Sequence, residues 1–222
     1  ASYTDLAGNS GAASNTLDLK VDNAPSITIS DDTVGTATDD VVFTIAFSEA
    51  VTGFSVSDVV VTGGTAGTLT ALSSSLYTLV VAPDSSSTAD ITVNIAADVV
   101  EDASGNGNLQ ATEATQAVDT AAPSAPSIAS VATNDAISAA EKSAGVAITG
   151  TSEADAQITI SFASESRVVS ANSSGAWTYT LTKADFKLMG EGSETISVTA
   201  TDAGGNTSTA DTASISIDTI RP

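Results

Sequence analysis

The chain has 222 residues, 41% of them hydrophobic, and it carries 27 acidic but only 6 basic side chains, for a net charge of −21. A surface this acidic repels phosphate groups, which excludes nucleic acids and anionic lipid surfaces as partners and favours cations. The chain contains no cysteine and no histidine, which excludes disulfides, thiolate or imidazole metal sites and Ser-His-Asp catalysis within it. No apolar run approaches the length that membrane insertion requires.

An acidic Gly-Asn turn, followed about 15 residues later by an Asp-to-Pro segment, occurs three times. The turn recurs 97 residues from Asp5 to Asp102 and 100 residues from Asp102 to Asp202. A period of this size predicts a tandem array of domains. We assign residues 1–22 to the C-terminal strand and loop of a preceding repeat, and residues 23–121 and 122–222 to two complete domains. Because the first repeat is incomplete, we expect the chain to be a piece of a longer protein.

The leading fragment contains one predicted strand, residues 16–21, in which apolar and polar side chains alternate. A single strand cannot satisfy its backbone groups alone, so we expect the segment from Ala1 to Asp22 to be mobile in a monomer.

The first complete domain consists of short β-branched runs separated by turn residues. Turns are predicted at Gly63-Gly64, at the serine run 73–75 and at 83–85. Strands are predicted at 26–29, 41–47, 56–61, 76–81 and 91–95. This spacing is typical of an antiparallel sandwich.

The second domain shows about seven such runs, the number that an immunoglobulin-like sandwich needs. They begin at 126–128 and continue at 146–150, 157–162, 167–169, 177–181, 196–200 and 213–217. Only residues 182–190 depart from the strand pattern. Thr182 followed by Asp185 resembles a capping box, which predicts one or two helical turns there. The predicted fold is therefore all-β, with two immunoglobulin-like antiparallel sandwiches joined end to end.

Several motifs resemble those of known proteins. Residues 47–54 together with 102–108, and residues 148–153 together with 175–177, 188–192 and 201–206, resemble two subtypes of bacterial immunoglobulin-like repeat. Such repeats form the calcium-stiffened stalks of giant bacterial surface adhesins, including type I-secreted (RTX) and biofilm-associated adhesins. The resemblance covers nearly the whole chain and implies calcium as the bound ion.

The strand order of a sandwich predicts where the acidic loops lie. The Gly-Asn turns become F–G loops, and Ser48-Glu49 and Ser152-Glu153 open the B–C loops, all at the N-terminal end of each domain. The linker aspartate arrives at the same end, so two carboxylate triads are predicted: Asp22, Glu49 and Asp102, then Asp119, Glu153 and Asp202. An all-oxygen cluster suits Ca²⁺. The alternative is that these residues only form turns, and Asn23 and Thr120 are weaker candidate ligands.

Other acidic and aromatic residues have simpler interpretations. Solvated surface is the expectation for charges away from the triads, namely Asp31, Asp32, Asp39, Asp40, Asp84, Asp90, Asp135 and Asp185. Phe162, Trp177 and Tyr179 could form a sugar platform, although in a domain so poor in aromatics we expect them in the core.

Three functional hypotheses follow from these features. The first is a structural extender of a bacterial cell-surface adhesin, extracellular and monomeric, whose partners are adjacent repeats and whose junctions bind Ca²⁺. The alternative is an adhesive module that binds a glycan or a protein through calcium-lined end loops. An enzyme is not expected. Paired carboxylates are the catalytic groups of glycoside hydrolases, but a chain with 27 Asp and Glu residues contains so many possible pairs that a pair is no evidence for this activity.

Overall fold

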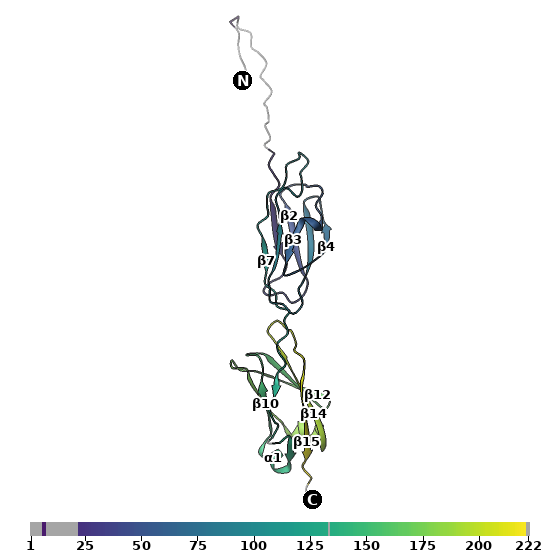
Figure 1. The fold of residues 1–222 in the computed structure, drawn as a ribbon, viewed down its shortest axis with the longest axis vertical. Helices are drawn as coiled ribbons and strands as arrows, with labels where there is room; N and C mark the ends of the chain where they lie inside the picture. Colours follow the sequence, from purple (N-terminus) through teal and green to yellow (C-terminus); the bar gives the residue numbers. More distant parts are fainter. Residues whose placement is uncertain (1–5, 8–21, 133, 221–222) are drawn as a thin grey trace.

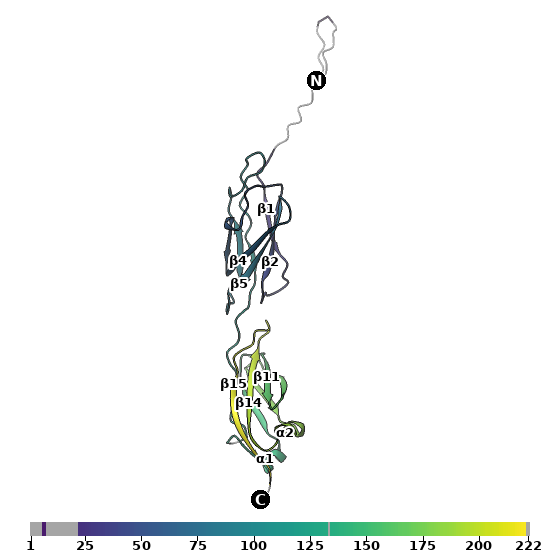
Figure 2. The same cartoon turned by 90° about the vertical axis from the view of Figure 1, so that its right-hand side faces the viewer.

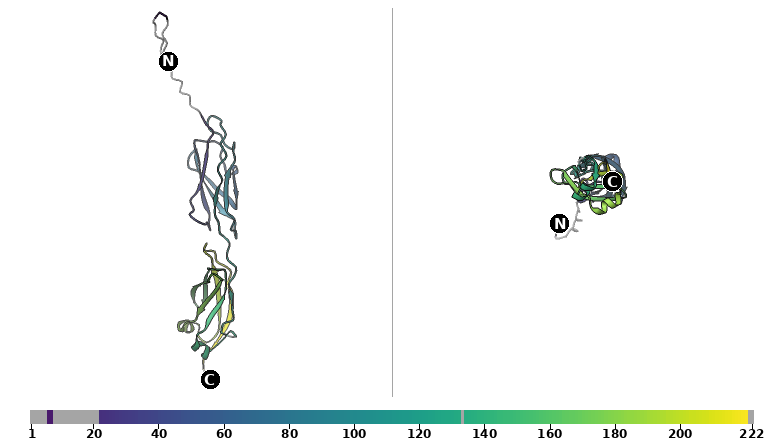
Figure 3. Two further views of the ribbon diagram at one scale, coloured as in Figure 1. Left: turned by 90° about the vertical axis from the view of Figure 1, so that its left-hand side faces the viewer. Right: turned by 90° about the horizontal axis from the view of Figure 1, so that it is seen from below.

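A computed structural model describes residues 6–7, 22–132 and 134–220. Residues 22–132 and 134–220 form two β-sandwiches arranged end to end along one long axis (Figure 1). Seen along that axis, one sandwich lies over the other (Figure 3). The predicted strand at 16–21 and the predicted mobility of the leading segment lie outside the described residues. None of the helices in the described part is long and apolar enough to span a membrane.

The first sandwich has seven strands in two sheets. One sheet has the order β1-β2-β5-β4 and the other β3-β6-β7, so that strands A, B, E and D face strands C, F and G, as in a constant-type immunoglobulin domain. The strands are β1 (Ile27–Asp31), β2 (Val41–Phe47), β3 (Val59–Thr62), β4 (Gly64–Ala71), β5 (Leu76–Pro83), β6 (Ile91–Ile95) and β7 (Ala114–Gln116), with a short 3-10 helix at Val56–Asp58 before β3.

Alternation along the strands builds the core of this sandwich. In β2 every second residue is buried, and Val41, Phe43 and Ile45 have no exposed surface. The same alternation in β6 buries Ile91, Val93 and Ile95 from the opposite sheet. Because successive side chains of a strand point to opposite faces, this pattern joins the two sheets through a single core.

The second sandwich distributes its strands differently. Its sheets have the orders β13-β10-β8 and β12-β11-β14-β15-β9, so β12 pairs with β11 rather than with β13. Its strands are β8 (Ser127–Ile128), β9 (Ala136–Ser138), β10 (Ala147–Thr151), β11 (Gln157–Phe162), β12 (Glu165–Ser170), β13 (Ala176–Thr180), β14 (Gly192–Thr201) and β15 (Asp211–Asp218).

Two short helices lie toward the C-terminal end of the second sandwich (Figure 2). The predicted helix is confirmed as α2 (Lys183–Met189), where Thr182 is the N-cap and forms a capping box with Asp185. A second helix, α1 (Ala139–Ala144), was not predicted, although Ser138 and Glu141 form the same capping box. Helix α1 contains only alanine and polar residues (AAEKSA), so it has no stripe of large apolar side chains that would predict a helix.

The prediction that the chain passes from the Gly63-Gly64 turn to a strand at 76 is wrong, because β4 lies between them and pairs with β5. Its Gly, Ala and Thr side chains are mostly exposed at the sheet edge, so no alternation of buried residues marks the strand. Residues 56–58 are a 3-10 turn rather than strand, since the Asp58 carboxylate accepts hydrogen bonds from the Ser55 amide and hydroxyl, both at 2.8 Å.

Candidate metal centre

Three carboxylates meet at the N-terminal end of the first sandwich. Asp22 comes from the linker before β1, Glu49 from the loop after β2, and Asp102 from the loop between β6 and β7. One oxygen from each lies within 4.8 Å of the other two. Asp102 is buried, Glu49 is half-buried and Asp22 is exposed, so the group opens to solvent on the linker side.

Asp102 is held rigidly by its own turn. Its Oδ1 accepts hydrogen bonds from the backbone amides of Ser104 at 2.8 Å and Asn106 at 2.9 Å, and its Oδ2 accepts one from Asn106 Nδ2 at 2.9 Å. Gly105 has φ +86°, which permits the tight return of the chain. These hydrogen bonds, first among them the one from the Asn106 side chain, lower the pKa of Asp102 below its ordinary value, so the carboxylate stays charged.

The linker is attached to the same turn by Ser104, whose hydroxyl donates a hydrogen bond to the Asp22 carboxylate. The backbone amide of Leu109 also donates to the Pro25 carbonyl at 2.8 Å. Ser104 was not among the residues predicted for this site. Its position between Asp102 and Gly105 in the repeated turn was the available signal.

Glu49 is the member of the group whose pKa is raised. Its pKa is raised above the ordinary value, first by desolvation and then by repulsion from Asp102 and Asp22. Residues 22–121 contain no lysine or arginine that could relieve that repulsion. Three carboxylates that converge in this way could hold a metal ion, and oxygen-only ligands suit a hard cation such as Ca²⁺.

The second junction repeats the turn but not the complete group. Asn206 donates to both oxygens of Asp202, through its amide at 2.8 Å and its Nδ2 at 3.0 Å, and its Nδ2 also lies 3.1 Å from the backbone oxygen of Asp119. Desolvation raises the pKa of Asp202, but the Asn206 hydrogen bonds outweigh it and the net shift is downward. A Cβ built on Gly204 would lie 3.3 Å from Asp202 and 3.5 Å from Asp119, so the two carboxylates flank one glycine.

Glu153 lies apart from that pair and lines a recess with the linker residues Ser124 and Ala125. Within the described ranges, three carboxylates come within 4.8 Å of one another only at the first junction. The geometry therefore brings Asp119 and Asp202 together and leaves Glu153 outside. The weaker candidate Thr120 faces its own domain, since its hydroxyl donates to the Asp84 carbonyl at 2.6 Å, and Asn23 is exposed.

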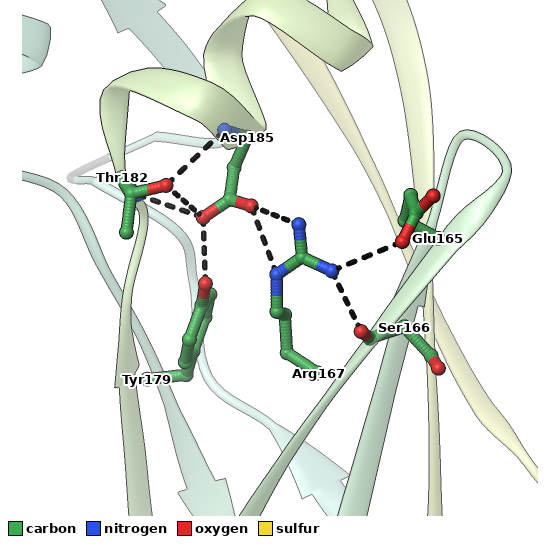
Figure 4. Close-up of polar contacts among 6 residues, drawn as sticks. All are labelled: Glu165, Ser166, Arg167, Tyr179, Thr182 and Asp185. Atoms are coloured by element: carbon green, nitrogen blue, oxygen red, sulfur yellow. Dashed lines mark hydrogen bonds and ion pairs between the residues drawn. The ribbon is translucent and has the colours of Figure 1, made fainter.

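Among the other acidic residues, Asp32, Asp39, Asp40, Asp84 and Asp90 are exposed, as expected. The expectation for Asp185 is wrong. Its side chain has no exposed surface, and its oxygens accept hydrogen bonds from Arg167, Tyr179 and Thr182 (Figure 4). A charge is tolerated there because every lone pair that faces the protein has a donor.

The aromatic residues lie where the core requires them. Trp177 and Phe162 are each 2% exposed and belong to the core of the second sandwich, and Tyr179 packs against it. A sugar platform needs ring faces open to solvent, so these residues do not form one.

The sheet orders and the end loops define an immunoglobulin-like β-sandwich protein. Residues 22–118 match one family profile described as a bacterial Ig-like domain, and residues 119–219 match a second profile with the same description. The chain is therefore a tandem of two bacterial Ig-like domains. Among curated proteins, none matches the chain.

Three solved structures align with this chain. A Ca²⁺-stabilized, ice-binding adhesin of an Antarctic bacterium aligns over 99% of this chain and 56% of its own, with 19% identity and a TM-score of 0.50; this chain thus spans about half the length of that structure. A 1.5-MDa bacterial ice-binding adhesin aligns over 99% of this chain and 73% of its own, with 19% identity and a TM-score of 0.45. A bacterial immunoglobulin-like domain of the M. primoryensis ice-binding adhesin aligns over 44% and 100%, with 24% identity and a TM-score of 0.34.

Proposed function

We propose that the chain is part of the extracellular stalk of a bacterial cell-surface adhesin, in which Ca²⁺ at the junctions between repeats stiffens the array and helps to project an adhesive tip. The observation that carries the proposal is the convergence of Asp22, Glu49 and Asp102 within 4.8 Å. The description of the Antarctic adhesin as Ca²⁺-stabilized supports it, as does the end-to-end arrangement of the two domains (Figure 1).

The physical argument begins from the linker. Asp22 belongs to the segment that enters the first sandwich, whereas Glu49 and Asp102 belong to loops of that sandwich. An ion shared by the three would fix the direction in which the chain enters the domain. Ca²⁺ takes six to eight oxygen ligands, so backbone carbonyls and water would supply the remainder.

The junction between the two domains is short and already restricted. Pro123 and Pro126 are buried, and proline limits its own backbone rotation and that of the preceding residue. Asn206 of the second domain donates to the Asp119 backbone of the linker. A cation bound by Asp119 and Asp202 would add a second connection between the linker and the second domain. It would restrict rotation about the linker and fix the angle between the two domains.

Calcium titration by calorimetry, with parallel melting in calcium and in chelator, tests the first site. With the ~10⁻⁴ to 10⁻³ M affinity of extracellular modules, roughly 10 mM calcium stabilises the first domain by about 1.4 to 2.7 kcal/mol. Glu49→Gln is expected to weaken binding at least about tenfold, because it removes one of three charged ligands. Asp90→Asn, an exposed acid far from the group, is the matched control. A melting temperature indifferent to calcium and chelator rejects the proposal.

Small-angle scattering tests the stiffening. In chelator the particle is expected to become shorter on average and more variable, while each sandwich stays folded. Asp119→Ala and Asp202→Ala are expected to give the same behaviour in the presence of calcium. An unchanged maximum dimension in all three cases would show that calcium does not stiffen this junction.

A further inference from the structure

Three of the four lysines of this acidic chain are concentrated at one place. Residues 22–121 contain no lysine or arginine, yet Lys142, Lys183 and Lys187 line a single groove of about 580 Å³ in the second domain. The groove lies between α1 and α2, and both helices lie toward the C-terminal end of the second sandwich (Figure 2). Half of the six basic side chains thus gather at one end of a molecule whose net charge is −21.

Two of the three lysines in this groove, which we call the lysine groove, have side-chain charges left unpaired by the described residues. Lys142 is positioned, with its Nζ 5.1 Å from the Phe186 ring centroid and 3.3 Å from Thr219 Oγ1. Lys183 and Lys187 are exposed, and neither of their side chains forms a hydrogen bond or ion pair with another residue that the structure describes.

The nearby carboxylates are already engaged. Glu141 accepts hydrogen bonds from the amide and hydroxyl of Ser138 at the start of α1. Glu191 accepts the Thr219 amide at 2.7 Å and also its hydroxyl. Glu141 therefore holds the start of α1, and Glu191 holds the segment after β15. The ammonium groups of Lys183 and Lys187 remain available to an external anion.

The groove lies at the C-terminal end of the second domain. The equivalent end of the first domain is the end that adjoins the second domain (Figure 1). Thr120, at the end of the first domain, is anchored to that domain through Asp84 and Ser87, as Thr219 is anchored through Glu191. Beside Thr120, residues Thr36, Thr38 and Asp119 share a recess with the loop of the second domain. The end of the second domain that carries the lysine groove therefore corresponds to the end of the first domain at which the second domain's loop lies.

We propose that the lysine groove docks the acidic N-terminal end of an immunoglobulin-like domain, an end of the kind formed by Asp22, Glu49 and Asp102, through lysine–carboxylate ion pairs that need no metal. The two available ammonium groups, of Lys183 and Lys187, are opposite in charge to those carboxylates, and Lys142 adds a third positive charge beside them. A long polyanion suits the groove less well, because the remaining surface of the chain repels it. This inference goes beyond the calcium-stiffened stalk, because it assigns one end of the second domain to a junction that forms without calcium.

A second copy of the chain presents the required acidic end, so self-association in chelator tests the proposal. Separate copies lack the covalent linker and its roughly millimolar effective concentration, so association is expected only at millimolar protein in low salt. Nuclear magnetic resonance shifts should change with protein concentration at both ends of the chain. Carbodiimide coupling between isotopically labelled and unlabelled copies should join lysines of the groove to Asp22, Glu49 or Asp102, while a Lys142–Glu191 product within one chain serves as the internal control.

Lys183→Gln with Lys187→Gln removes two exposed charges without touching the core and should weaken association about tenfold. Lys183→Arg with Lys187→Arg keeps the charges and should retain it. Absence of any concentration dependence up to about millimolar protein, or intermolecular products spread evenly over the surface acids, overturns the proposal. Binding of a polyuronate without self-association would assign the lysine groove to an anionic polysaccharide instead. Calcium is absent throughout, so failure here does not bear on the metal site.

Discussion

Replacing Asp185 with alanine tests whether one buried charge holds the second sandwich together. Asp185 lies on α2, and its partners Arg167 and Tyr179 lie on β12 and β13, strands of opposite sheets (Figure 4). The network therefore joins the helix to both sheets at the side where β12 and β13 do not pair with each other.

The magnitude follows from the hydrogen bonds and the burial. Asp185 has no exposed surface and accepts bonds from Arg167 Nη2 at 2.8 Å, Tyr179 Oη at 2.6 Å and the Thr182 amide at 2.8 Å, with further bonds from Arg167 Nε and the Thr182 hydroxyl. Breaking a buried ion pair costs about 3 to 5 kcal/mol. Because 28% of the Arg167 side chain is exposed, its charge can rehydrate and the lower end, about 3 kcal/mol, is expected.

Differential scanning calorimetry measures this cost domain by domain. A loss of about 3 kcal/mol should lower the melting temperature of the second domain by roughly 12 to 24 °C and leave that of the first unchanged. Glu165→Ala is the matched control, since Glu165 also pairs with Arg167, at 3.4 Å, but is 52% exposed, and its loss should cost under about 1 kcal/mol.

The pH dependence provides a second measurement. Desolvation raises the pKa of Asp185, but the hydrogen bonds from Tyr179, Thr182 and Arg167 outweigh it and hold the pKa below 3.8. The stabilisation is therefore present above the unfolded-state pKa and is lost as pH falls through the folded one. Asp185→Asn should flatten the acid limb of the stability curve. A cost of Asp185→Ala no larger than that of Glu165→Ala would refute this account of the network.

Three other perturbations have defined outcomes. Gly150→Ala should destabilise the second domain by several kcal/mol, detected by calorimetry, because the added Cβ would lie 2.5 Å from the Trp177 ring and 1.8 Å from a backbone oxygen; a loss under about 1 kcal/mol would show that the strand can shift aside. Asn108→Ala should cost the first domain about 2 to 4 kcal/mol in denaturant unfolding, because Asn108 is 1% exposed and its amide makes four hydrogen bonds to the backbone of its loop; an unchanged midpoint would contradict that role. Calcium affinity, measured by titration, should fall as pH is lowered through the raised pKa of Glu49, since calcium competes with the proton, and Glu49→Gln should remove that part of the pH dependence.

The repeated turns and the alternating strands were sufficient to predict the fold class. The period between Asp102 and Asp202 and the short β-branched runs indicated sandwiches in tandem, and the strand at 91–95 agrees with β6 residue for residue. These features are local, because backbone alternation and turn chemistry depend on neighbours in the sequence. The capping box before α2 was visible for the same reason.

The first carboxylate group could also be predicted, because strand order alone places the B–C and F–G loops at one end of a sandwich. The arrangement at the second junction could not. The same turn there brings Asp202 to Asp119 but leaves Glu153 beside Ser124, and that outcome depends on how the linker crosses the end of the domain.

Only the tertiary structure decided the fate of Asp185 and of the lysines. A carboxylate in an exposed-looking helical turn becomes fully buried because Arg167, 18 residues earlier in the chain, supplies the compensating charge. Lys142 and Lys187 are likewise far apart in sequence and line one groove because α1 and α2 lie at the same end of the sandwich. Sequence spacing carries no information about such contacts, since packing between elements, rather than chain order, determines which charges meet.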